Sequence, residues 1–189
     1  MTRFTIDWNE LTATEATPDE IAQHAAALSA GYNEPRNAEL MGHTAAISPA
    51  EVVESYADGI AAGMRAFLLF ERGALAGDAD LRNVRDGAAE FAFMIGAPSA
   101  QGKGLGTRFA LMIHAFGFRE LQLARIYASV VPHNVASRRV FEKLGYIVDD
   151  SPAARAFADE PGDVTLALDR TSFERAHAST LAAIRIGVR

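Results

Sequence analysis

Residues Gly96–Thr107 read G-A-P-S-A-Q-G-K-G-L-G-T, and this glycine-rich stretch decides how the neighbouring segments are interpreted. Before it, Glu90–Ile95 is a short run of apolar and aromatic residues, which is typical of a β-strand. After it, apolar residues recur at helical spacing over Leu105–Arg119. The sequence therefore predicts a strand, a glycine-rich turn and a helix.

The predicted turn has the properties of an anion site. Gly102, Gly104 and Gly106 let a ligand approach the backbone closely and permit positive φ angles. The first N–H groups of the following helix lack intrahelical partners and lie at the positive end of the helix dipole. Such a site suits phosphate. A P-loop is excluded because its G-x-x-x-x-G-K-[ST] spacing is absent, and a dinucleotide fingerprint fails because its third glycine is missing.

A second informative segment is Arg125–Tyr146, which reads R-I-Y-A-S-V-V-P-H-N-V-A-S-R-R-V-F-E-K-L-G-Y. Its β-branched run, Ile126–Val131, predicts a strand. Asn134 is a suitable N-cap for a helix over Val135–Leu144, and Gly145 is a suitable residue to end that helix.

Together the two segments resemble a known family. The Q-x-x-G-x-G pattern runs from Gln101 through Gly104 to Gly106, and an N-x-x-S-x-x-x-F-E-K-L-G-Y pattern begins at Asn134. They are similar to the two cofactor-binding segments of the GNAT superfamily of acyl-CoA N-acyltransferases. The residues of these two segments are most similar to those of the branch that contains ribosomal-protein alanine acetyltransferases and spermidine acetyltransferases. The resemblance is firm over Arg65–Tyr146 and faint elsewhere.

The resemblance implies an α/β protein with the GNAT fold. We expect a mixed, mostly antiparallel sheet of about six to seven strands, flanked by about four helices. The strand before the glycine-rich loop and the strand after the next helix should splay apart, with acetyl-CoA in the gap. We expect residues 1–189 to form a single domain, with residues 171–189 as a C-terminal tail.

Local signals organise the first half of the chain. Thr17 is a suitable N-cap for a first helix, and Ser48–Glu51 is a capping box for a second one. Between these helices, Tyr32–Ile47 is expected to be irregular. Further on, Gly77 suggests a bulge within a strand, and Arg85–Gly87 predicts a hairpin turn.

Composition limits the classes of function. The chain has 189 residues and no cysteine, which excludes disulfides and a thiol nucleophile. We see no membrane-spanning run and no signal peptide, and expect a cytoplasmic protein. The net charge of −6 argues against a nucleic-acid surface and favours cationic acceptors such as amines. We expect no metal site, because the histidines are scattered, and His114 is expected on the surface of its helix. A homodimer is left open.

The resemblance also assigns residues to the binding of acetyl-CoA as co-substrate. The backbone amides of Met94, Ile95 and Gly96 should pair with the pantetheine arm. Asn134 and Ser137 should also contact that arm. The residues expected at the pyrophosphate are Gln101, Gly102, Lys103, Gly104, Leu105, Gly106 and Thr107, with Arg138 as a further phosphate contact.

Catalytic roles follow from what acetyl transfer to an amine requires. Glu90 is the expected base, since relatives often carry a glutamate there, and Asp78 and Asp80 are reserve candidates that could instead bind a cationic acceptor. Many relatives have a tyrosine before E-K-L-G as the acid for the leaving thiolate, but this chain has Phe141. Ser137 is the expected substitute.

The sequence therefore predicts an acetyl-CoA-dependent N-acetyltransferase. The acetyl group would move to a primary amine by direct attack in a ternary complex. The amine could be a protein N-terminus, a polyamine or another small amine. The alternative is a catalytically weak acyl-CoA-binding or regulatory module on the same fold, which the phenylalanine before E-K-L-G keeps open.

Overall fold

The structure of the protein, a computed structural model, describes residues 2–42, 44–96 and 102–189. Its strands are β1 (Phe4–Trp8), β2 (Leu11–Glu15), β3 (Arg65–Glu71), β4 (Ala74–Arg85), β5 (Ala88–Ile95), β6 (Arg125–Val130), β7 (Ile147–Val148), β8 (Val164–Asp169) and β9 (Arg185–Val188). Its helices are α1 (Pro18–Tyr32), α2 (Pro35–Met41), α3 (Pro49–Ala61), α4 (Leu105–Arg119), α5 (Val135–Leu144), α6 (Pro152–Arg155) and α7 (Arg170–Leu181).

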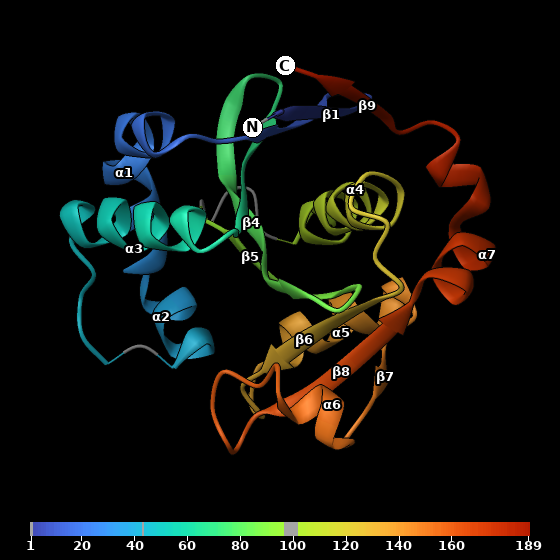
Figure 1. Cartoon of the computed structure of the whole chain (residues 1–189). Coiled ribbons are helices and arrows are strands. Elements are labelled where there is room, and N and C mark those ends of the chain that lie inside the picture. The colour runs from blue at the N-terminus through green and yellow to red at the C-terminus, as the bar shows by residue number, and fades with distance from the viewer. Residues whose placement is uncertain (1, 43, 97–101) are drawn as a thin grey trace.

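The strands form one mixed sheet in the order β7-β8-β6-β5-β4-β3-β2-β1-β9 (Figure 1). Neighbouring strands are antiparallel except β5 and β6, which are parallel. The β5–β6 pairing joins Ala88–Glu90 to Arg125–Tyr127, and in the described residues it extends no further. β5 then continues to Ile95 while β6 stays paired with β8. The expected separation of these two strands is therefore present.

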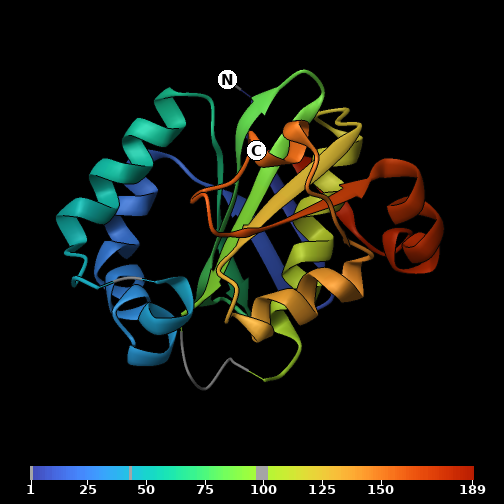
Figure 2. The same ribbon diagram turned by 90° about the horizontal axis from the view of Figure 1, so that it is seen from below.

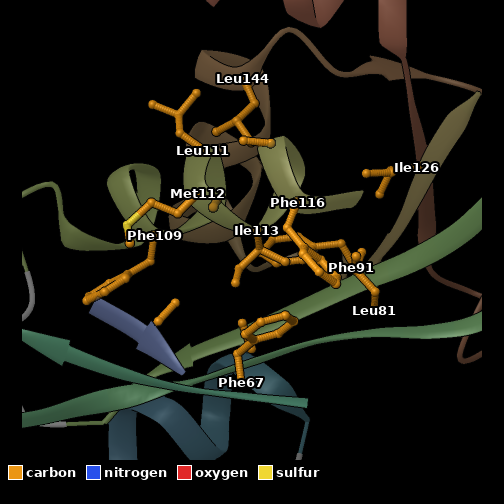
Figure 3. Close-up of a cluster of buried hydrophobic side chains, with 14 of the residues drawn as sticks. Phe67, Leu81, Phe91, Phe109, Leu111, Met112, Ile113, Phe116, Ile126 and Leu144 are labelled. Atoms are coloured by element: carbon orange, nitrogen blue, oxygen red, sulfur yellow. The ribbon is translucent and has the colours of Figure 1, made fainter. Parts of the chain in front are cut away.

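Helices cover both faces of the sheet. Helices α1, α2 and α3 lie together on one side, and α4 lies on the other side with α5 and α7 next to it (Figures 1 and 2). The larger hydrophobic core lies between the sheet and α4. In it, Ile113 and Phe116 of α4 face Phe67 and Phe91 of the sheet (Figure 3).

His114 is buried, so the expectation that it lies on the surface of its helix is wrong. The side chain is fully enclosed, because α4 is covered by the sheet on one side and by α5 and α7 on the other. Its Nδ1 lies 2.7 Å from the carbonyl oxygen of Ala110, and its Nε2 lies 2.6 Å from the hydroxyl of Tyr146. Burial lowers the pKa of His114 to about 3, which keeps the imidazole neutral.

The first turn of α4 is fixed to the β1–β2 hairpin. Arg108 places its guanidinium over the ring of Trp8, 5.1 Å from the centroid, and its Nη1 lies 2.6 Å from Oε1 of Glu10. A cation–π contact and an ion pair therefore hold the helix start against the N-terminal hairpin.

The predicted helix caps are confirmed. Thr17 and Ser48 each accept a hydrogen bond from a backbone N–H three residues later, and each pairs with a glutamate to complete a capping box. The side chain of Asn134 caps α5 by accepting a hydrogen bond from the backbone N–H of Ser137, and Gly145 ends the helix with a φ of 96°. The segment expected to be irregular, Tyr32–Ile47, contains the short helix α2.

The structure corrects the expected number of elements. Its described residues form nine strands and seven helices, more than the expected six to seven strands and four helices. The sequence did not predict β2. This strand has only five residues, Leu11–Glu15, and follows β1 after a two-residue turn. The segment expected to be a tail, residues 171–189, contributes most of α7 and the whole of β9, which pairs with β1.

Gly77 lies beside the expected bulge. The register of β3 and β4 shifts between Leu69, which faces Gly77, and Phe70, which faces Leu75. A Cβ added at Gly77 would lie 1.9 Å from the carbonyl oxygen of Met94 on β5. The two strands can therefore approach this closely only because residue 77 has no side chain.

We predict that Gly77→Ala lowers the free energy of unfolding by about 1–3 kcal/mol or more, because backbone atoms must move to admit the methyl group. Thermal unfolding followed by circular dichroism measures the change. Gly187→Ala on β9 is the matched control, since a Cβ there meets no atom within 4 Å. Equal melting temperatures for the two variants would contradict the close approach.

Candidate active site

Two cavities adjoin where β5 and β6 separate. The larger has a volume of about 720 Å³ and the smaller of about 340 Å³. They share six lining residues, which come from α2, β5 and α5: Leu40, Met41, Phe93, Met94, Asn134 and Ser137. The two cavities therefore form one continuous site with two ends.

The smaller cavity contains the N-terminus of α4. Gly104 caps this helix with a φ of 76° and offers no side-chain hydrogen bond, so the first N–H groups of the helix have no capping side chain. Arg36, Arg139 and Lys143 add positive charge, and no carboxylate is among the described residues that line the cavity. This combination is suited to a ligand with several phosphates.

Most residues expected at the cofactor line this smaller cavity. They are Met94, Ile95, Gly102, Gly104, Leu105, Gly106, Thr107, Asn134 and Ser137. Gly96, Lys103 and Arg138 are not among its described lining residues, and Gln101 lies outside the residues that the structure describes. The backbone N–H of Gly96 donates to the carbonyl of Ala76 instead, at 2.9 Å.

Two cations of α5 line this cavity in addition to the residues expected from the resemblance, which assigned Arg138 of the same helix to phosphate. Arg139 and Lys143 are four residues apart, so they lie on one face of the helix, and both line the cavity. Arg138 is turned by about 100° from Arg139. Ala136 and Val140 line the cavity as well, so the helical spacing 136, 139, 140 and 143 marks this face of α5 in the sequence.

The side chain of Asn134 has two structural partners. Its Oδ1 accepts a hydrogen bond from the backbone N–H of Ser137 at 2.9 Å, and its Nδ2 donates to the carbonyl of Leu40, also at 2.9 Å. Asn134 therefore caps α5 and ties it to α2 across the junction of the two cavities.

The larger cavity is acidic. Its wall includes six carboxylates, and Arg82 is the one cation among the described residues that line it. The carboxylates belong to Glu51, Asp78, Asp80, Asp159, Glu160 and Asp163. A cationic ligand would be attracted to this end of the site, and an anion would be repelled.

The acids reach the cavity from three directions. Asp78 and Asp80 alternate along β4 and so share one face of the sheet with Arg82. Glu51 lies in the first turn of α3, and the other three acids come from the loop after α6. This loop is held in place by Ser129, whose hydroxyl donates to Oδ2 of Asp163 at 2.7 Å, and by the stacked rings of Tyr127 and Phe157, 4.6 Å apart.

Asp78 is the most enclosed acid of this wall, with 2 % of its surface exposed. Its Oδ2 accepts a hydrogen bond from the hydroxyl of Tyr32 at 2.6 Å and another from the hydroxyl of Tyr56. Its Oδ1 is buried and has no hydrogen-bond partner in the described part of the chain. Burial raises the pKa of Asp78 to about 6, although the two tyrosine hydroxyls act in the opposite direction.

Arg82 neutralises part of the acidic wall. Its Nε lies 2.9 Å from Oδ1 of Asp80, and its Nη1 lies 3.7 Å from Oδ1 of Asp159. Burial raises the pKa of Asp80, and the Arg82 guanidinium limits that rise. Arg82 thus links the β4 wall to the loop after α6.

Glu90 lies on the same face of the sheet, opposite Arg82 in the β4–β5 register. It is 2 % exposed, and its Oε2 accepts a hydrogen bond from Nδ2 of Asn83 at 3.0 Å. Burial raises the pKa of Glu90 to about 7. It does not line either cavity within the described residues, so the structure does not bring this expected base together with Ser137.

Phe141 lines the larger cavity close to Ser137 along α5. Its ring is 3 % exposed and packs edge-to-face against Phe91, Phe93 and Tyr146. The aromatic side chain that stands where many relatives have a tyrosine is therefore part of the hydrophobic core.

The described residues offer neither a metal site nor a membrane-spanning helix. No group of three or more histidine, aspartate or glutamate side chains is arranged to hold a metal ion there. None of the helices there is both long enough and apolar enough to cross a membrane.

The fold and the glycine-rich helix start define an acyltransferase-like α/β architecture. Residues 8–147 match the sequence model described as an acetyltransferase (GNAT) domain. The chain therefore belongs to the GNAT acetyltransferase family.

Individual relatives are more distant. Spermidine N(1)-acetyltransferase of Escherichia coli K12 is 39 % identical over 61 residues, 32 % of each chain, so the match spans about a third of that relative. RimJ of Mycobacterium smegmatis, solved with CoA-disulfide, superposes with a TM-score of 0.70 at 16 % identity and covers 98 % of this chain and 96 % of its own. Spermidine N-acetyltransferase of Vibrio cholerae, solved with CoA and spermine, gives 0.68 at 20 % identity and covers 87 % and 98 %.

We predict that Asp78→Asn changes how stability depends on pH. Because the pKa of Asp78 is raised from 3.8 to about 6 in the folded state, its protonated form favours folding, and this contribution is lost as the pH rises through 6. Between pH 5 and pH 8 the wild type should lose about 1.4 kcal/mol relative to Asp78→Asn, or roughly 3–6 °C in melting temperature.

Melting curves of both proteins across this pH range measure the difference. Glu54→Gln is the control, since it removes one exposed carboxylate from α3. A difference between wild type and Asp78→Asn that stays constant with pH would show that Asp78 does not titrate in this range.

Proposed function

We propose that this protein is an acetyl-CoA-dependent N-acetyltransferase that moves the acetyl group to a cationic primary amine. One observation carries the proposal: two adjoining cavities of opposite charge share a junction at Met94 and Ser137. A polyanionic donor and a cationic acceptor would each be drawn to its own end, and their reacting groups would meet at the junction. Binding both substrates makes the transfer effectively unimolecular, which supplies much of the rate.

The smaller cavity would hold the phosphates of acetyl-CoA. The N-terminus of α4 offers backbone N–H groups, and Arg36, Arg139 and Lys143 offer positive charge. The CoA complexes of the RimJ and Vibrio cholerae structures support this assignment. We also retain Gln101, Lys103 and Arg138 as proposed phosphate contacts.

The larger cavity would hold the acceptor. Its excess of carboxylates favours an amine that carries further positive charge. The reacting nitrogen must become neutral before it attacks, and carboxylates that do not themselves accept its proton oppose that loss. They would be better matched to other cationic groups of the same molecule. A polyamine therefore fits the cavity, as the spermine complex of the Vibrio cholerae relative suggests. A protein N-terminus followed by basic residues is the other acceptor we propose.

Chemistry would proceed by direct attack of the neutral amine on the thioester carbonyl carbon. A C–N bond forms, the C–S bond breaks and the thiolate leaves. We propose that Ser137, which lines both cavities, donates a proton to the thiolate sulfur. Its backbone N–H donates a hydrogen bond to Oδ1 of Asn134, which holds Ser137 in the first turn of α5.

The competing proposal is a protein that binds acetyl-CoA and transfers the acetyl group weakly or not at all. Phe141 favours it, because this buried ring has no proton to give. Incubation with acetyl-CoA and a panel of spermidine, putrescine, benzylamine and a basic peptide with a free N-terminus separates the two. Release of free CoA that depends on the amine supports the enzyme. Tight acetyl-CoA binding without release supports the binding module.

We predict that the double variant Arg139→Ala, Lys143→Ala weakens acetyl-CoA binding at least about tenfold, because two charge-assisted phosphate contacts are lost. Isothermal titration calorimetry at low and high salt measures the change, which should shrink as salt screens the charges. Arg175→Ala on the exposed face of α7 is the control. A loss of affinity in Arg138→Ala, with none in the double variant, would favour the assignment made from sequence.

We predict that Ser137→Ala lowers kcat by about 100-fold if its hydroxyl protonates the thiolate, while the Kd for acetyl-CoA changes little. Stopped-flow detection of free CoA gives kcat, and calorimetry gives the Kd. An unchanged kcat would mean that the thiolate leaves without help from this side chain.

A further inference from the structure

We propose that Asp78, held by Tyr32 and Tyr56, binds the reacting nitrogen of the acceptor and takes its proton. The proposal rests on the proposed function and deepens it by naming the group at which the amine is held. It differs from the assignment of Glu90, which was made from sequence and stays a competing prediction.

The carboxylate of Asp78 on β4 has hydrogen bonds on one oxygen only. Two helices converge on it, α1 through Tyr32 and α3 through Tyr56. Both hydroxyls donate to Oδ2, while Oδ1 has no hydrogen-bond partner among the described residues. A buried acceptor without a donor is destabilising. The N–H group of a bound amine would supply the missing donor.

Asp78 also lies close to the junction of the two cavities. Asp78 lies directly opposite Met94 in the β4–β5 register, and residues opposite each other in antiparallel strands have their Cβ atoms about 5 Å apart. Met94 lines both cavities, whereas Asp78 lines only the larger one. The carboxylate is therefore on the acceptor side, next to the place where the donor cavity begins.

The charge of Asp78 is not balanced by a cation of its own in the described residues. The groups that face Asp78 are the hydroxyls of Tyr32 and Tyr56, the carboxylate of Asp80 and the guanidinium of Arg82, while Leu68 of β3 beside it is apolar. Arg82 is engaged by Asp80 and by Asp159 of the loop after α6, and faces Glu90 of β5. Asp78 has no salt-bridge partner in the described residues, so an ammonium group would be its counter-ion.

The proton balance is complete. The bound R–NH3⁺ passes one proton to Oδ1 of Asp78, which leaves a neutral amine and a neutral carboxylic acid. The amine attacks the thioester carbon, and the second proton that nitrogen loses ends on the departing sulfur. Asp78 then releases its proton to solvent, so the products are the N-acetyl amine, free CoA and one proton. The raised pKa of Asp78 supports this role, because a more basic carboxylate takes a proton from an amine more readily.

The test uses the amine of the panel with the highest wild-type kcat/KM, and measures kcat/KM from pH 5 to pH 9. Asp78→Asn should lower kcat/KM by about 100-fold or more, remove the acid limb of the profile and leave the Kd for acetyl-CoA unchanged. Glu90→Gln should keep the limb. Glu54→Gln, which removes an exposed carboxylate from α3, is the control for net charge.

Tyr32→Phe and Tyr56→Phe give a readout that a merely structural role would not move. Each removes a hydrogen bond that stabilises the charged carboxylate, so the acid limb should shift to higher pH in both. These variants keep the proposal testable if Asp78→Asn melts below the assay temperature.

The outcomes are distinct. If the wild type releases no CoA with any amine, the proposed function fails. If the wild type is active and the acid limb vanishes in Glu90→Gln but persists in Asp78→Asn, the assignment to Asp78 is overturned. A limb that stays in place in both tyrosine variants would overturn it as well.

Discussion

The site depends on a short stretch of parallel pairing. β5 and β6 are joined only over Ala88–Glu90 and Arg125–Tyr127 in the described residues, and then separate. Parallel strands need a long connection, and here that connection contains α4, whose apolar face packs under both strands. Had the pairing continued, side chains and hydrogen bonds would fill the gap. Because it stops, backbone groups at the end of β5 and the N-terminus of α4 face the same space.

The clustered carboxylates of the larger cavity destabilise the fold, and a neighbouring arginine offsets part of this effect. Six carboxylates around one cavity repel one another, and Asp78 and Glu90 are buried as well. Burial accordingly raises the pKa of both groups above the ordinary range of carboxyls. Arg82 offsets part of the repulsion by joining Asp80 to Asp159. The acids lie at one end of the site and the cations at the other, and the six lining residues that the two cavities share carry no charge.

Features encoded by adjacent residues could be predicted from the sequence. The strand β5 and the helix α4 on either side of the glycine-rich stretch, and the caps at Thr17, Ser48 and Asn134, are local, and the structure confirms them. The family resemblance also rests on local motifs, and the GNAT domain match over residues 8–147 confirms it. Elements defined by distant pairing were missed. β9 exists because it pairs with β1 at the other end of the sheet, and no short window of sequence contains both.

The same distinction holds for the site. Its glycines and the capping Asn134 lie in recognisable motifs, whereas Asp78 meets hydroxyls that are 46 and 22 residues away. Nothing in the local sequence links those three residues. The prediction for His114 was wrong for a related reason. Its side chain is polar, but α4 is covered by the sheet on one side and by α5 and α7 on the other. Burial of this kind is a property of the assembled layers rather than of the helix.

The contact between Arg108 and Trp8 gives the molecule an optical property. Trp8 is the one tryptophan of the chain, and the guanidinium that covers it belongs to the first turn of α4. That turn also carries Thr107, which lines the smaller cavity. The protein's single indole thus lies beside the helix start that faces the proposed phosphates, which places a native fluorophore at that end of the site.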